Sequence, residues 1–286
     1  MRVGLINLDS KLPNIALEKI KMYYGHAEYI EPIEAHNYDK VYCSSVFSRT
    51  DKSYVSDAWI CGGTGFDLTT NLPKEIDEMK PKINYGFTTR GCIRNCAFCV
   101  VPKKEGKLRV VGDIYDIWDR KNKDLCLFDN NILGLPSHFF MICEQIKKEK
   151  IRVDFNQGLD HRLLTDDICK ELKSIRHKEY HFAFDDIAYE KTVREAIKML
   201  NKNGIKRSIW YVLIYNTDES FEDALYRTES VLKPLNQNAF VQRYNYNGNW
   251  DRKHNELASW CNQHGWFHKS KFEEFRKIRG YNFNRG

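Results

Sequence analysis

Residues 89–99 read TRGCIRNCAFC, which places Cys92, Cys96 and Cys99 in the spacing C-x₃-C-x₂-C. Three thiolates on one tight loop can hold three irons of a [4Fe–4S] cluster and leave the fourth iron open. A zinc site would need a fourth ligand nearby, and the next histidine is His138, far downstream. The spacing therefore predicts an iron–sulfur cluster with one open iron. Zinc binding and buried, inert thiols are the alternatives.

On the C-terminal side of this loop, apolar strand-like runs alternate with amphipathic helical patterns. Counting the run that precedes the loop, they cover residues 83–88, 125–129, 151–156, 180–184, 208–214 and 239–244. The clearest helical pattern is residues 191–200, with Val193, Ala196, Ile197 and Leu200 on one face. Residues 165–175 and 221–232 are similar. These strand–helix units predict a partial (βα)₆ TIM-like barrel, because they are too few for a closed eight-stranded barrel.

The segments on either side of the barrel differ from it in pattern. Residues 1–80 predict a small Rossmann-like α/β domain, with strands at 3–8, 27–30, 40–44 and 58–61. A helix opened by Pro13 and ended by Gly25 follows the first strand. The barrel is assigned to residues 81–247. Residues 248–286 predict a helical C-terminal extension, with helices near 252–263 and 270–279.

Composition excludes several classes of protein. The 286 residues are 42% hydrophobic, which is enough for a packed core and argues against a disordered chain. The apolar run at Met1–Ile6 is too short for a signal peptide, and no segment reaches membrane length, so we expect a cytoplasmic protein without membrane contact. Nine cysteines in that compartment are expected to be thiols or metal ligands. The net charge of +6 reflects solubility or an anionic partner such as nucleic acid.

The stretch GCIRNCAFCVVP at residues 91–102 resembles the cluster loops of the radical S-adenosylmethionine superfamily. It is most similar to those of methylthiotransferases and of the B12-domain branch, with Phe98 at the family's usual aromatic position. The resemblance covers residues 82 to about 246 and, more weakly, a short degenerate N-terminal domain. It implies that S-adenosylmethionine chelates the open iron and is cleaved reductively to a 5′-deoxyadenosyl radical. It also implies an electron donor such as flavodoxin or ferredoxin.

The resemblance assigns roles to polar residues that follow the predicted strands, since chemistry in such barrels collects at the C-terminal strand ends. Asp129, Asn130 and Asn131 would meet the amino group of S-adenosylmethionine, where many members carry a Gly-Gly-Glu run that this chain lacks. Gln157 and Asp185 would face the ribose or the substrate, and Asn216 lies at the same rim. Helix capping and turn formation suit the same residue types equally well.

The N-terminal segment lacks two features of the branches that the cysteine loop resembles. A cobalamin-binding domain carries a DxHxxG run, and the nearest match, residues 9–14, has no histidine. We therefore expect no bound cobalamin. Methylthiotransferases hold a second cluster on three N-terminal cysteines, whereas only Cys43 and Cys61 occur here. Cys126, Cys143, Cys169 and Cys261 lie in apolar patterns and are expected in the core.

The sequence thus predicts a radical S-adenosylmethionine enzyme that modifies an unidentified substrate. A nucleobase in RNA or DNA is the first candidate, with a peptide or a small metabolite as alternatives. The competing hypotheses are a B12-dependent radical methyltransferase and a nucleic-acid-binding module whose cluster is structural. The aromatic residues of the C-terminal extension would either pack on the barrel as a lid or stack on bases.

Overall fold

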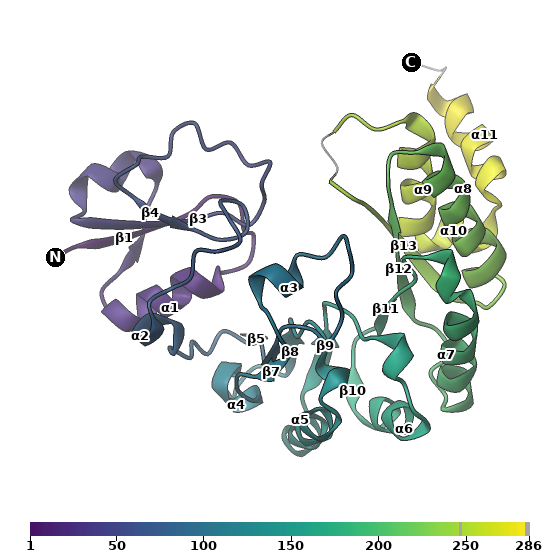
Figure 1. Cartoon of the computed structure of the whole chain (residues 1–286), viewed down its shortest axis with the longest axis horizontal. Helices are drawn as coiled ribbons and strands as arrows, with labels where there is room; N and C mark the ends of the chain where they lie inside the picture. Colours follow the sequence, from purple (N-terminus) through teal and green to yellow (C-terminus); the bar gives the residue numbers. More distant parts are fainter. Residues whose placement is uncertain (246–247, 284–286) are drawn as a thin grey trace. The chain divides into compact units, whose positions relative to one another are not determined.

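The N-terminal strands form a parallel sheet. In the computed structural model, which describes residues 1–245 and 248–283, its order is β2-β1-β3-β4. The strands, at the purple end of the colour scale in Figure 1, are β1 (Val3–Asn7), β2 (Glu28–Tyr29), β3 (Lys40–Ser44) and β4 (Ile60–Gly62). The strands predicted between residues 1 and 80 are therefore confirmed. The chain divides into two compact units, Met1–Asn122 and Lys123–Gly286, and each is described by itself.

Helix α1 (Ile15–Tyr24) follows β1 and covers one face of this sheet. It begins two residues after Pro13 because the side chain of Asn14 accepts hydrogen bonds from the amides of Ala16 (3.1 Å) and Leu17 (3.3 Å). It ends at Gly25, whose left-handed φ of 70° lets its amide reach the Lys21 carbonyl. The predicted glycine stop is confirmed.

Two apolar cores lie on opposite faces of the sheet, as the alternation of side chains along a strand requires. On the α1 face, Leu17 and Ile20 pack with Val3, Leu5 and Tyr42. On the other face, a second cluster combines strand residues with partly buried side chains of the loops. Its members are Ile6, Val41, Cys43, Leu8, Ile30, Ala35, Tyr38, Val55, Trp59, Cys61 and Phe66.

The rest of the first unit consists of short elements. They are η1 (Pro32–Asn37), α2 (Lys74–Asp77), β5 (Tyr85–Gly86), β6 (Thr89–Arg90), α3 (Val101–Lys104), β7 (Arg109–Val110) and α4 (Ile114–Ile117). The predicted strand at 83–88 is reduced to the two residues of β5. Asn84 has a φ of 64°, which interrupts the extended backbone. Strands β6 and β7 pair antiparallel and join Thr89 to Val110 and Arg90 to Arg109.

The second unit contains two sets of parallel strands. Strands β8 (Asp124–Leu127), β9 (Arg152–Phe155) and β10 (Arg176–His177) lie side by side, with β9 in the middle. Strands β11 (His181–Ala183), β12 (Ile209–Ile214) and β13 (Asn238–Arg243) form the other set, with β12 in the middle. One isolated parallel bridge links Leu159, after β9, to Phe182 in β11. Every strand predicted between residues 125 and 244 is present, and β10 is an addition.

Helices follow most of these strands, as their apolar periodicity indicates. They are α5 (Pro136–Glu149), α6 (Asp166–Ser174), α7 (Glu190–Lys202) and α8 (Asp218–Leu225), and short turns η2 (Ile132–Gly134), η3 (His161–Leu163) and η4 (Ile187–Tyr189) precede three of them. Thr165 and Thr217 cap α6 and α8 through their hydroxyl groups. The predicted helix at 221–232 changes character at its middle, because α8 continues as the π-helix η5 (Tyr226–Leu232).

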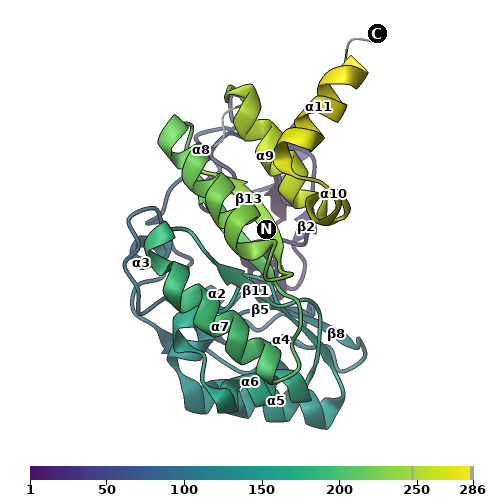
Figure 2. The same cartoon turned by 90° about the vertical axis from the view of Figure 1, so that its right-hand side faces the viewer.

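Over its described residues, 248–283, the C-terminal extension forms three helices, where two were predicted. They are α9 (Arg252–Asn262), α10 (His264–Lys269) and α11 (Phe272–Phe283), coloured yellow-green to yellow in Figure 2. Helices α9 and α10 contact β13, and α11 contacts α9. Trp260, Phe267, Phe272 and Phe275 are buried, so these aromatic side chains form a core under the extension. The protein is thus a mixed α/β structure with parallel sheets and helices.

Candidate functional site

The three-cysteine loop is anchored by the β6–β7 ribbon. Gly91, which precedes the first cysteine, has a φ of 85°, and a Cβ atom there would lie 2.4 Å from the Lys107 carbonyl oxygen and 2.6 Å from that of Gly106. Only glycine fits this turn, because the contacting atoms belong to the backbone. The amide of Cys92 in turn donates to the Gly106 carbonyl at 3.4 Å. The loop therefore leaves and rejoins the ribbon at one narrow neck.

An ion pair joins the two sides of this neck. Arg90 Nη1 lies 2.9 Å from Glu105 Oε2, and both side chains are largely buried. The Arg90 guanidinium also lies over the Phe87 ring, 4.3 Å from its centroid. Beyond the cysteines, Lys104 in α3 donates to the Thr70 carbonyl at 3.2 Å. Lys104 therefore has a structural contact.

Cys92, Cys96 and Cys99 are partly exposed thiols without disulfides. The amide of Arg94 donates to Cys92 Sγ at 3.3 Å. Among the described residues, no three His, Cys, Asp or Glu side chains are gathered closely enough to hold a metal ion. The donor set fits an iron–sulfur cluster in chemical type and in its accessible position, and the cluster itself stays a prediction.

The other cysteines are in a different environment. Cys143, Cys169 and Cys261 are buried in helices, and Cys43 is buried in β3. Burial raises the pKa of Cys169 to about 11 and that of Cys43 to about 12. Burial likewise raises the pKa of Cys61 and of Cys126, the latter to about 12. These thiols remain protonated at neutral pH and are poor metal ligands. The core assignment is confirmed for the buried helical cysteines, while Cys126 is only half-buried.

The polar residues after β8 and β9 lie in the second unit and form one network. Asn131 Nδ2 donates to Asp160 Oδ2 at 3.3 Å, and Arg162 Nε donates to Asp160 Oδ1 at 2.8 Å. Asp129 and Asn131 are buried, and Asn130 is half-buried. The structure therefore brings the loop after β8 and the turn after β9 together. Asp160 also caps η3, so one of its roles is the capping that the sequence allowed.

The remaining predicted residues are dispersed along the strand ends. Gln157 is exposed in the turn after β9. Asn216, after β12, is exposed, and its side-chain oxygen accepts from the Asp251 amide at 3.2 Å. Asp185, after β11, accepts from the Leu213 amide at 3.1 Å. Burial raises the pKa of Asp185, and the hydrogen bond from Leu213 and the nearby Arg227 only partly oppose this. In the first unit, Phe98 is half-buried within the cysteine loop.

Arg227, near the ends of β11 and β12, is a residue that the sequence did not single out. It lies in the π-helix η5, is 3% exposed, and donates to the carbonyls of Phe184 and, at 3.1 Å, Leu213. It therefore fixes the backbone where β11 and β12 end. Burial lowers the pKa of Arg227, and Asp185 opposes this. π-Helices often mark functional sites, but an arginine in a helical pattern gives no such signal in the sequence.

A second group that was missed lies within the strands. Asp154 in β9 is 8% exposed, and His181 in β11 stacks on Tyr211 of β12, with ring centroids 5.3 Å apart. Among the described residues, Asp154 Oδ1 and His181 Nδ1 are buried without a hydrogen-bond partner. A polar residue between apolar neighbours in a strand is a signal that could have found Asp154. Asp154, between Val153 and Phe155, shows it clearly.

In the N-terminal domain, Asp9 holds the loop after β3. Its carboxylate accepts hydrogen bonds from the amides of Val46 (2.8 Å) and Phe47 (3.0 Å) and from the hydroxyls of Ser45 and Thr50. Partial burial raises the pKa of Asp9, but these hydrogen bonds outweigh it and the pKa is lowered overall. Asp9, the first residue of the stretch nearest to a DxHxxG run, is therefore used for loop structure.

No family model and no curated protein matches this chain. Over residues 1–245 and 248–283, no helix is both long and apolar enough to cross a membrane.

Proposed function

We propose that this protein is a radical S-adenosylmethionine enzyme with a [4Fe–4S] cluster on Cys92, Cys96 and Cys99. The observation that carries the proposal is the C-x₃-C-x₂-C spacing on a partly exposed loop. Outside this loop, the cysteines have thiols whose pKa is raised by burial, so the loop holds the thiols best suited to a metal. A cluster bound there would supply the electron that cleaves S-adenosylmethionine reductively.

The chain's own contribution at this loop is rigidity. Gly91 permits the narrow neck, and the Arg90–Glu105 ion pair closes it from the side. The narrow neck and the ion pair limit the conformations of the residues in the loop. Less conformational entropy is therefore lost when three thiolates bind iron. The basic residues Lys103 and Lys104 in α3 follow the loop and lower the electrostatic cost of anionic sulfur ligands.

We assign the finer architecture to a partial (βα)₆ TIM-like barrel. The parallel pairs β8–β9, β11–β12 and β12–β13, with helices between successive strands, support this assignment. The bridge from Leu159 to Phe182 supports continuity between the two sets of strands. In such a barrel the loops after the strands share one rim, where substrates bind.

At this rim we assign Asp129, Asn130 and Asn131 to the amino group of S-adenosylmethionine. The network from Asn131 through Asp160 to Arg162 supports this role, because it orients the loop after β8 before a ligand arrives. Gln157, Asp185 and Asn216 are assigned to the ribose, the adenine edge or the substrate, and Phe98 to the apolar side of the cofactor. Arg227 is a positioning residue, since it holds the strand ends that carry Asp185.

A reconstitution experiment tests the proposal. Anaerobically loaded protein with a low-potential reductant should convert S-adenosylmethionine to 5′-deoxyadenosine and methionine. Cys96→Ala should abolish both cluster loading and this turnover, whereas Cys169→Ala, which alters a buried thiol, should retain them. Product formed at the same rate by a variant lacking all three loop cysteines would refute the proposal.

The biological setting follows from the same assignment. Reductive cleavage needs an electron donor of the flavodoxin or ferredoxin class, and such donors belong to the cytoplasm, where we place the protein. A nucleobase in RNA or DNA remains our first candidate for the substrate, on the basis of the basic residues of the C-terminal extension and of analogy at the level of the fold.

A further inference from the structure

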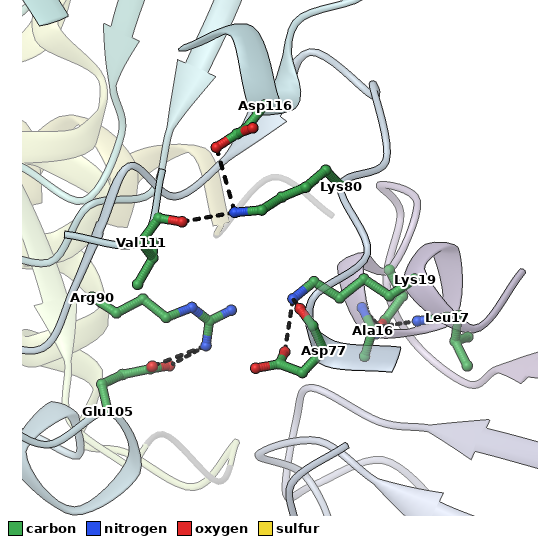
Figure 3. A network of polar contacts seen from close by, with 10 residues as sticks. Ala16, Leu17, Lys19, Asp77, Lys80, Arg90, Glu105, Val111 and Asp116 are labelled. Carbon is green, nitrogen blue, oxygen red and sulfur yellow. Dashed lines mark hydrogen bonds and ion pairs between the residues drawn. The ribbon is translucent and has the colours of Figure 1, made fainter. Parts of the chain in front are cut away.

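A cavity of about 370 Å³ in the first unit is lined by four cationic side chains. They are Lys19 from α1, Lys80 from the segment after α2, Arg90 from β6 and Arg109 from β7. The carboxylates in the lining are Asp77 and Glu78, so the wall carries four positive and two negative charges. Figure 3 shows Lys19, Lys80 and Arg90 approaching this space from different segments of the chain.

Hydrogen bonds and ion pairs fix the positions of these cationic side chains. Lys80 Nζ donates to the Val111 carbonyl at 2.7 Å and lies 3.4 Å from Asp116, and Arg90 is paired with Glu105. Arg109 donates to two backbone carbonyls, which are neutral acceptors. A lysine ammonium has three donors and a guanidinium five, so each retains donors for a ligand.

The pKa of Lys19 reflects the charges around the cavity. Its ammonium lies 2.7 Å from Asp77 and is largely removed from water. Burial lowers its pKa, and the neighbouring charges of Arg90 and Lys80 lower it further, which outweighs the stabilisation by Asp77. Positive charges that repel one another around an open space are stabilised by an anion placed between them.

A second, mainly apolar cavity of about 380 Å³ adjoins the first and shares Ile15, Lys19, Asp77 and Arg90 with it. It lies over β3 and β4, against Tyr42 and Ile60. The connection between these strands, residues 45–59, is fully described and contains no helix. Ile60 is 46% exposed.

The polar end of this second cavity is built at the C-terminal edge of the sheet. Ser44, Gly62 and Gly63 line it, and a Cβ atom on Gly63, whose φ is 97°, would lie 2.4 Å from the Ser45 carbonyl oxygen. Ligands of open parallel sheets bind outside the carboxyl ends of the strands, at the point where the strand order reverses. Here the order β2-β1-β3-β4 reverses between β1 and β3, next to Ser44.

We propose that the adjoining cavities form one site for a phosphorylated small molecule that carries a ring, such as a nucleoside monophosphate. The phosphate binds among Lys19, Lys80, Arg90 and Arg109. The ring lies in the apolar cavity, against Tyr42 and Ile60. Arg90 and Arg109 are register partners in the ribbon that anchors the cysteine loop, so a bound anion also braces the base of that loop. The site is separate from the cysteines and does not require iron.

Calorimetric titration of the full-length protein with AMP, adenosine and inorganic phosphate at low salt tests this proposal. AMP should bind most tightly, because only AMP fills both cavities. The double variant Lys80→Met/Arg109→Met should weaken AMP binding about 100-fold, since each lost charge-assisted contact is worth about tenfold. The control Lys191→Met/Lys198→Met removes the same charge from exposed positions of α7 and should change AMP affinity less than about twofold.

A conservative variant controls for the possibility that the substitutions unfold the protein. Lys80→Arg/Arg109→Lys keeps both charges and should bind AMP within about tenfold of the unaltered protein. The proposal is overturned if AMP does not bind to the folded protein or if adenosine binds as tightly as AMP. It is also overturned if Lys80→Met/Arg109→Met binds AMP no more weakly than the α7 control.

Discussion

Gly91→Ala should destabilise the cysteine loop by an amount that the geometry defines. An alanine held at a φ of 85° costs about 1–2 kcal/mol relative to glycine. Its Cβ atom would also lie 2.4 Å from the Lys107 carbonyl oxygen, so the ribbon must open, which adds about 1–3 kcal/mol. The expected loss in the free energy of local unfolding is therefore about 2–5 kcal/mol.

Gly106→Ala is the matched control in the same loop. Gly106 has a φ of 73°, but no atom lies within 4 Å of the position that its Cβ would occupy. This variant carries only the backbone strain, about 1–2 kcal/mol. The difference between the variants isolates the steric contact, about 1–3 kcal/mol, which corresponds to about 5–150-fold in the local opening equilibrium.

Hydrogen exchange of the amides in residues 89–110, followed by mass spectrometry, measures this opening directly. Gly91→Ala should exchange faster than Gly106→Ala, and after reconstitution it should hold less iron per chain. Equal exchange rates in the two variants would show that the neck is not closed as described, and the account of the loop's rigidity would fail with it.

Other predictions concern single side chains. Because the folded-state pKa of Asp185 is raised above its ordinary value of 3.8, its contribution to stability is present below that value and is lost as pH rises through the folded-state pKa. Asp185→Asn should therefore become more stable relative to the unaltered protein as pH rises. Urea unfolding at several pH values measures this difference, and a difference that does not change with pH would contradict the prediction. Asp9 has a lowered pKa, so Asp9→Asn should lower the free energy of unfolding at pH values above 3.8, the ordinary pKa of this carboxyl group. The effect should vanish as pH falls, and the same unfolding series would test it. Arg227→Met leaves buried carbonyls and Asp185 without their cation and should lower the free energy of unfolding by about 3–5 kcal/mol. Arg227→Lys should lower it less. Equal stability of the two variants in denaturant would contradict this role.

The elements were predictable wherever a local signal sets the backbone. The strands of the first sheet and the glycine stop of α1 depend on apolar runs and on one left-handed residue, and both are readable in sequence. The strand expected at 83–88 was wrong over most of its length, because Asn84 adopts a φ of 64° and its side chain pairs with Asp119 at 2.8 Å. That partner is 35 residues away, and strand propensity does not contain it.

The candidate sites also divide into those with a local signal in the sequence and those without one. The cysteine spacing is a local property, so the loop could be identified from the order of its residues alone. Arg227 could not be found, because its role depends on carbonyls of β11 and β12 that only the fold brings to it. The cationic cavity was missed for the same reason, since Lys19, Lys80, Arg90 and Arg109 are spread over the first unit and no two are neighbours in sequence.

The cysteine loop and the cationic cavity share the ribbon formed by β6 and β7, and this sharing has a thermodynamic consequence. Arg90 pairs with Glu105 across the neck of the loop and also lines the cavity. If an anion there stabilises the closed neck, occupation of the loop by metal must raise affinity for the anion by the same factor, because coupling between two binding equilibria is reciprocal. Titrations of AMP into metal-loaded and metal-free protein measure that factor. Identical affinities would mean that the ribbon carries the two sites without connecting them.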